Sequence, residues 1–337
     1  MLELVPRLFV GLLPVVVFLV FLIYLDSYKL VGLKTVLLTM LAGSAVAGAS
    51  YGVDRWILHA SGLELRMLSR YIAPFIEEAF KGAVVLALIR SHRIGFHVDA
   101  AILGFATGTG FALVENLYYL NLLPDSAFVV WIVRGFGTAL MHGGVAAIFG
   151  VVAKSLGDRW GGAGVAAPAT ALLLAAIVHS FFNHFFFTPV LSAVLVVVVL
   201  PPLLALVFRR SERALQDWLG SGFDEDVRLL ELIHSGEFTA SRPGRYLHEL
   251  AERFPGPVVA DMLCYLRLYL ELAVRAKGEL MMRESGFRTE MEPETRAKFE
   301  EMTFLERSIG PTGLRAMEPF LHVSGRDLWQ LYLLGKA

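Results

Sequence analysis

The sequence predicts an all-α membrane protein: a bundle of about seven transmembrane helices followed by a small all-α cytoplasmic domain. The 337 residues are 56% hydrophobic and only 18% charged, which is typical of multi-span membrane proteins. The apolar residues gather into long runs that end at Phe208. From Arg209 onward the chain is charged and has helical periodicity instead.

Each apolar run is long enough to cross a bilayer, which takes about 17 to 25 residues in a helix. The first run continues into Asp26 and Ser27 without a small-residue cleavage site, so we interpret it as an uncleaved span. Glycines in the second, fourth and fifth runs predict closely packed helices. The predicted spans are Leu8–Leu25, Leu33–Val53, Tyr71–Ile89, Val98–Leu120, Phe128–Ala153, Val165–Phe187 and Val190–Phe208.

Lysines and arginines near the span ends predict the orientation, because cytoplasmic loops carry the excess of these residues. With the N-terminus outside, the larger group falls on the cytoplasmic side. We therefore expect a multi-pass protein of the cell membrane with its C-terminal domain in the cytoplasm. The loop Asp54–Arg70 is basic although it falls outside, and we expect it to lie in the interface. The cytoplasmic group is Lys29, Lys34, Arg90, Arg93, Lys154, Arg159, Arg209, Arg210 and Arg213; the outer group is Arg7, Arg55, Arg66 and Arg70.

The change of composition predicts two domains, residues 1–208 in the membrane and residues 209–337 outside it. The second domain has no Gly-rich phosphate loop and no metal-ligand spacing, so its sequence does not indicate its role. A net charge of −1 gives no electrostatic reason to expect a nucleic-acid partner, and the single cysteine, Cys264, excludes an intrachain disulfide. The predicted helices of the second domain are Asp224–Ile233, Arg245–Phe254, Val258–Glu284 and Pro293–Ser308.

Charged and polar side chains interrupt four of the spans, although each costs at least a few kcal/mol unless it faces protein or a wet cavity. In the third span, Lys81 follows Glu77 by four residues and Glu78 by three. In a helix, this spacing lets its ammonium reach either carboxylate. A structural ion pair between spans is the plain alternative to a functional site. The other polar groups are Glu115 and Asn116 in the fourth span, Arg134 and His142 in the fifth, and His179 and Asn183 in the sixth.

Depth along the spans puts these groups in compatible layers. At about 1.5 Å per residue, the three glutamates and Arg134 fall in the outer third of the membrane, and the two histidines fall near the middle. Glutamate with histidine suits the activation of a water molecule. The same residue types suit a divalent metal or a proton-coupled transporter, and spacing alone does not choose among these.

Four motifs follow one another on successive spans between residues 70 and 187. They are Pro74 to Lys81 (PFIEEAFK), Phe111 to Glu115-Asn116, Arg134 through His142-Gly143, and His179-x-x-x-Asn183. In this order they resemble the motifs of the PrsW family of intramembrane proteases, which belongs to the superfamily of the type II CAAX prenyl endopeptidases. Each motif alone is weak, whereas four in order on separate spans are a specific signal.

The resemblance implies that a water molecule activated by glutamate and histidine hydrolyses a peptide bond of a membrane-anchored protein. The implied partners are the lipid bilayer and a single-pass membrane protein as substrate, with an anti-sigma factor as one candidate in the first cut of regulated intramembrane proteolysis. The implied catalytic set is Glu77 as the general base, Glu78 as its partner held by Lys81, His142 and His179 positioning water or the oxyanion, Asn183 as a donor and Glu115 as a second acidic member, with Asn116 and Arg134 in support.

Zinc stays open as a cofactor, since the family has been treated both as metal-dependent and as glutamate-dependent; its ligands would be Glu77, His142 and His179. Glu115 stands where the prenyl-protease branch has a histidine, which disfavours prenyl-peptide cleavage. Two alternatives remain. An ion-coupled secondary transporter predicts internal repeats, which we do not find between spans one to three and four to six. A catalytically silent scaffold of the same fold predicts the loss of a motif residue, and all of them are present.

Overall fold

The computed structural model describes residues 4–160, 164–287 and 293–321, together with residues 329 and 334. These described residues form helices and connecting turns, and no strand is found among them. The chain divides into two compact units, Met1–Glu212 and Arg213–Ala337. The first unit contains the predicted membrane spans and all the polar groups of the four motifs.

Among the described residues, six helices are long and apolar enough to cross a membrane. The predicted third span forms α4 (Ala73–Arg90), which packs among α2, α5, α7 and α8. Helix α4 is not one of these six, because it carries four charged residues, at positions 77, 78, 81 and 90. The all-α membrane bundle that the sequence predicts is confirmed. The six are α1 (Leu4–Leu25), α2 (Leu33–Ser61), α5 (His97–Leu122), the joined helix from α6 (Phe128–Val133) to α7 (Leu140–Arg159), α8 (Ala166–His184) and α9 (Pro189–Ser235).

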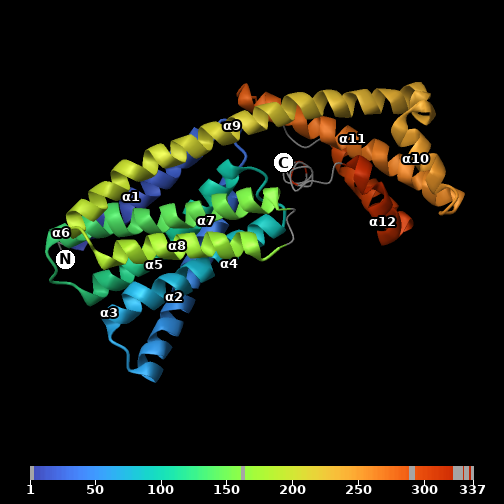
Figure 1. Ribbon diagram of the computed structural model, residues 1–337. Coiled ribbons are helices and arrows are strands. Elements are labelled where there is room, and N and C mark those ends of the chain that lie inside the picture. The colour runs from blue at the N-terminus through green and yellow to red at the C-terminus, as the bar shows by residue number, and fades with distance from the viewer. Residues whose placement is uncertain (1–3, 161–163, 288–292, 322–328, 330–333, 335–337) are drawn as a thin grey trace. The chain divides into compact units, whose positions relative to one another are not determined.

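Helix α5 is the centre of the first unit, and its residues are buried without interruption from Val98 to Ala112. It packs most extensively against α7 and α2, and Figure 1 shows α4, α5, α7 and α8 side by side. Glycines allow this close approach: a carbon atom added to Gly104 would lie 2.5 Å from the carbonyl oxygen of Ala146 on α7. The packing explains the density of small residues in the fourth and fifth spans.

Two π-helical turns interrupt the bundle helices in the part of the chain that the structure describes, and the sequence pattern did not predict them. The turn η1 (Leu68–Ile72) joins the short α3 (Leu65–Met67) to α4, and η2 (Arg134–Ala139) joins α6 to α7. Turns of this kind are rare and recur at functional sites. Here η1 ends five residues before Glu77, and η2 ends three residues before His142.

Helix α9 differs from the prediction because it continues without a break through the change of composition after Phe208. No turn-forming glycine or proline occurs at that point, so the change lies inside one helix that ends only at Gly236, whose φ is 79°. The helix predicted at Asp224–Ile233 is therefore the last part of α9. The change in composition reflects the surroundings of the helix, and the backbone hydrogen bonds continue through it unchanged.

The second unit packs its remaining helices around α11 (Gly256–Glu284), which supplies the largest share of its buried core. The Ser241 hydroxyl caps α10 by accepting from the Gly244 amide. The last described helix, α12, is interrupted at Gly310, where φ is 70°. The other elements of this unit are η3 (Glu237–Ala240), α10 (Arg242–Leu250) and α12 (Pro293–Leu321).

Candidate active site

The polar side chains of the four motifs meet in the interior of the first unit. They come from α4, α5, α7 and α8 and from the π-helical turn η2, so residues far apart in the sequence share one site. The structure brings together Glu77, Glu78, Lys81, Glu115, Asn116, Arg134, His142 and His179. Asn183 lies on the same stretch of α8 as His179, and its hydrogen bond goes to η1.

Lys81 lies at the centre of this cluster and is fully buried. Its Nζ atom lies 2.6 Å from Oε1 of Glu78 and 2.8 Å from Nδ1 of His142. The distance to Oε2 of Glu77 is longer, at 3.8 Å. Because an ammonium group only donates, the Nδ1 atom of His142 must accept. Lys81 therefore binds Glu78 and His142 directly and leaves Glu77 without a close partner.

The other ring nitrogen of His142 contacts Glu115. Since Nδ1 accepts from Lys81, the ring proton is on Nε2, which donates to Oε2 of Glu115 at 2.7 Å. The Glu115 carboxylate also contacts the Arg134 guanidinium, with Oε1 3.2 Å from Nη2. Both nitrogens of His142 are thus engaged, and its tautomer and orientation are fixed.

Arg134 is held in turn by side chains of α5, one of which is bonded to α1. Its Nε donates to Oδ1 of Asn116 at 2.8 Å, and the Asn116 amide donates to the Gly11 carbonyl oxygen of α1 at 2.7 Å. The guanidinium also lies over the ring of Tyr119, 3.9 Å from its centroid. The cation and its amide neighbour therefore join α1, α5 and η2 around Glu115.

His179 has one engaged nitrogen and one free nitrogen. Its Nδ1 lies 2.8 Å from Oε1 of Glu78, and because a carboxylate only accepts, the proton is on Nδ1. The Nε2 atom then carries a lone pair and lies 3.9 Å from Oε2 of Glu77. A carboxylate that fixes a histidine in this way is the usual support of a histidine that binds water or metal.

Glu77 is the one carboxylate of α4 that Lys81 leaves without a close contact. Its Oε2 is buried and has no hydrogen-bond partner among the described residues. Such an atom is costly to leave unpaired in a protein interior, so it marks a place for a ligand, a water molecule or a metal ion. The side chain is 16% exposed, whereas that of Glu78 is 0% exposed.

The residue types also fit a divalent metal. Ligand atoms of Glu77, His142 and His179 all lie within 4.8 Å of one another, and two histidines with one glutamate form a known catalytic zinc set. Glu77 and His179 each offer a free atom. The Nδ1 of His142 already accepts from Lys81, so His142 joins such a site only when the ammonium moves away.

The end of α8 contacts the backbone of η1. The Asn183 amide donates to the Ser69 carbonyl oxygen at 2.9 Å, and the Ser180 hydroxyl donates to the Arg70 carbonyl oxygen at 2.6 Å. Sequence analysis selected Asn183 as a donor to substrate and did not select Ser180. The signal that points to Ser180 is Pro74, since a proline inside a helix leaves a backbone carbonyl without its usual donor.

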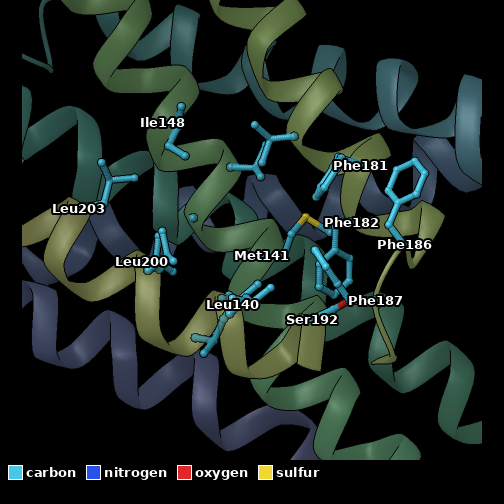
Figure 2. A pocket seen from close by; sticks show the side chains of 16 residues that line it. Leu140, Met141, Ile148, Phe181, Phe182, Phe186, Phe187, Ser192, Leu200 and Leu203 are labelled. Atoms are coloured by element: carbon cyan, nitrogen blue, oxygen red, sulfur yellow. The ribbon is translucent and has the colours of Figure 1, made fainter. Parts of the chain in front are cut away.

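An apolar cavity of about 260 Å³ lies between α7, α8 and α9, apart from the polar cluster. Figure 2 shows the phenylalanines of the α8 end, the residues of α7 and the residues of α9 around it. The polar side chain in its lining is Ser192, and no titratable residue of the cluster contributes to it. The labelled lining residues are Leu140, Met141, Ile148, Phe181, Phe182, Phe186, Phe187, Ser192, Leu200 and Leu203.

Comparison with models of protein families gives a match. A family model described as PrsW family intramembrane metalloprotease matches residues 29–207, which is more than half of the chain. The match includes every titratable side chain of the cluster and both π-helical turns. Neither the curated proteins nor the solved structures contain a significant match.

Proposed function

This chain belongs to the PrsW family of intramembrane metalloproteases, and on that premise we propose that it hydrolyses a peptide bond of a membrane-anchored protein with Glu77 as the general base. The observation that carries the proposal is the free Oε2 of Glu77, which lies 3.9 Å from the free Nε2 of His179. One water molecule between these two atoms can hydrogen-bond to both. The pair therefore suits the activation of water in a buried site.

In this mechanism Glu77 takes a proton from the water while His179 orients it, and the resulting hydroxide attacks the carbonyl carbon of the peptide. The charge that develops on the carbonyl oxygen is stabilised by the nearby Lys81 ammonium, which needs no reorganisation in a buried site. Protonated Glu77 then donates to the leaving amine. Glu78 is a positioning residue, because it holds Lys81 on one side and His179 on the other.

Glu115, Arg134 and Asn116 support the site from the other side. They orient His142, which donates to Glu115 and accepts from Lys81. The position of the Lys81 ammonium is thereby fixed by Glu78 and His142 together. This role explains why a histidine, a glutamate and an arginine are kept inside the bundle despite the cost of burying them.

A divalent metal such as zinc fits the same residues, with Glu77 and His179 as ligands and His142 as a third after Lys81 moves away. When bound, the ion would supply an activated water molecule and polarise the peptide carbonyl. The protein's own contribution stays the same in this version: Glu78 orients His179, and Glu115 orients His142.

For the substrate we propose a single-pass membrane protein, with an anti-sigma factor as one candidate. For the orientation we propose an outer N-terminus and a cytoplasmic C-terminal unit. The Arg7 guanidinium donates to the Pro124 carbonyl oxygen, so the start of α1 and the loop between α5 and α6 lie on the same side of the bundle. Both segments fall on the outer side in the proposed orientation.

The test is cleavage of single-pass reporters in a membrane. A panel of single transmembrane segments, each carrying a different epitope tag at either end, is co-expressed with the full chain, and fragments are detected by immunoblot. We expect Glu77→Gln to lower cleavage by about 100-fold or more, as loss of a general base does. Glu64→Gln, in the exposed loop before α3, is the matched control. Cleavage by Glu77→Gln at the wild-type rate would overturn the proposal.

A further inference from the structure

The helix that carries Glu77 contains a proline, and this creates a gap in its backbone hydrogen bonds. The segments α3, η1 and α4 follow one another without interruption from Leu65 to Arg90, with Pro74 inside them. A residue at this position would donate its N–H to the carbonyl of Arg70 in an α turn, or of Ser69 in a π turn. Proline has no N–H, so this donor is missing.

The missing donor is supplied from α8. The Ser180 hydroxyl lies 2.6 Å from the Arg70 carbonyl oxygen, and the Asn183 amide nitrogen lies 2.9 Å from that of Ser69. The N–H of residue 74 would bond to one of these two carbonyls, depending on whether the turn is α or π. Inside a membrane protein such groups are satisfied by side chains of neighbouring helices. Ser180 and Asn183 are three residues apart, so both project from one side of α8.

A third contact reinforces this attachment. The ring of His184 packs edge-on against Tyr71 of η1, with 4.8 Å between the ring centroids. Its Nδ1 lies 2.7 Å from the Ser180 carbonyl oxygen, which keeps the ring in place. One stretch of α8, residues 180–184, thus holds η1, and the residue just before it, His179, contacts the glutamates of α4.

We propose that Ser180 and Asn183 are positioning residues, which replace the backbone donor missing at Pro74 and so keep Glu77 in register with His179. Without them η1 can rewind into an ordinary α turn, and the π turn's extra residue shifts the helical register by about 100°. The proposal gives Asn183 a structural partner in η1 in place of a substrate oxygen. It rests on the proposed function only where it concerns catalysis.

The first experiment needs no substrate. Amide hydrogen exchange is measured by mass spectrometry on the full chain in lipid nanodiscs, over the peptides that cover residues 68–77. We expect Asn183→Ala and Ser180→Ala each to speed exchange there roughly 3- to 10-fold, the range expected for the loss of one hydrogen bond. Thr170→Ala is the matched control, since this hydroxyl of α8 bonds within its own helix, to the Ala166 carbonyl oxygen.

A double-mutant cycle tests the link to the proline. In Pro74→Ala the backbone N–H returns, so we expect Asn183→Ala to have little further effect on exchange in that background. An Asn183→Ala effect that is equally large with proline and with alanine at residue 74 would overturn the proposal. Unchanged exchange over residues 68–77 in both single variants would overturn it as well.

Cleavage of the tagged reporters gives the catalytic readout. We expect Ser180→Ala and Asn183→Ala both to lower kcat with little change in KM, because they act through the position of Glu77. If Asn183 instead donates to the substrate, Asn183→Ala lowers kcat, Ser180→Ala is silent, and exchange at η1 stays at the control level; that result would contradict the inference. If no reporter is cut by the wild-type chain, the proposed function fails, and the exchange arm still decides the inference.

Discussion

Lys81 assigns different surroundings to two adjacent glutamates. Helical spacing lets its ammonium reach either glutamate. In the packed bundle it pairs with Glu78, since Nζ is 2.6 Å from Glu78 and 3.8 Å from Glu77. The second contact of the ammonium, to Nδ1 of His142, fixes it on the Glu78 side. A free carboxylate and a paired one thus stand next to each other, which is the division of roles that acid–base chemistry needs.

Removing the Lys81 ammonium is expected to increase metal binding. In Lys81→Met the Nδ1 of His142 becomes free, and the cluster of three glutamates keeps only the Arg134 cation, so a divalent ion gains both a ligand and a favourable charge. Zinc content is measured by mass spectrometry after equilibration and removal of free zinc. We expect more zinc per chain in the variant than in the wild type.

The matched control for this prediction is Lys154→Met. Lys154 is also a buried lysine of the bundle, and it pairs with Asp158 on its own helix at 2.6 Å. We expect its zinc content to equal that of the wild type. A lower zinc content in Lys81→Met than in the wild type would mean that the ammonium helps to build the site instead of competing for it.

The approach of α5 to α7 decides at the level of elements whether His142 meets Glu115. An added carbon at Gly108 would lie 2.7 Å from the Cα of Gly143, directly after His142. We expect Gly108→Ala to push the helices apart, to destabilise the unit by about 1–3 kcal/mol as overpacking does, and to reduce reporter cleavage. Thermal unfolding in detergent measures the loss of stability. Gly48→Ala in α2, which meets nothing within 4 Å, is the control, and equal melting temperatures would contradict the prediction.

The turn between α1 and α2 makes stability depend on pH. Asp26 is 3% exposed, and its Oδ2 accepts from the Val31 amide. Burial raises the pKa of its carboxyl from 3.8 to about 6, because the charged form loses its hydration. The folded chain therefore holds a proton that the unfolded chain releases near pH 4. The unfolding free energy falls as the pH rises from about 4 to about 6 and stays lower above that range.

Asp26→Asn is expected to remove this loss, since asparagine keeps the acceptor oxygen and does not titrate. At pH 7 the variant should be more stable than the wild type by about 2–3 kcal/mol, at 1.36 kcal/mol per pKa unit, and the two should converge below pH 4. Thermal unfolding in detergent between pH 4 and pH 7 measures the difference, with Asp125→Asn in an exposed loop as the control. If the stability of the wild type and of Asp26→Asn changed with pH in parallel, Asp26 would not be the source of the pH dependence.

Across the whole molecule, the features that depend on local pattern follow from the sequence, and those that depend on packing do not. Apolar runs predict the bundle, and their depth predicts that Glu77, Glu115 and His179 lie in compatible layers. The π turns escape prediction because a single extra residue in a turn leaves the 3.6-residue pattern nearly unchanged. The hydrogen bond of Asn183 was not predicted because its acceptor is a backbone carbonyl of η1, and the only sequence signal for that acceptor is the proline at position 74.

The orientation of the whole chain can be tested through its one cysteine. Cys264 lies on α11 of the second unit and is exposed. With the N-terminus outside, seven spans put this unit in the cytoplasm, in agreement with the surplus of lysine and arginine on that side. A membrane-impermeant maleimide should then label Cys264 only after the membrane is opened.

A second variant gives the opposite expectation and makes the result independent of reagent access. In a Cys264→Ser background, Asp125→Cys puts a thiol in the exposed loop between α5 and α6. That loop is outside in the proposed topology, so it should be labelled in intact cells. Labelling of Cys264 in intact cells together with protection of the residue 125 thiol would reverse the orientation, and it would turn the Arg7 end of α1 and the α5–α6 loop toward the cytoplasm.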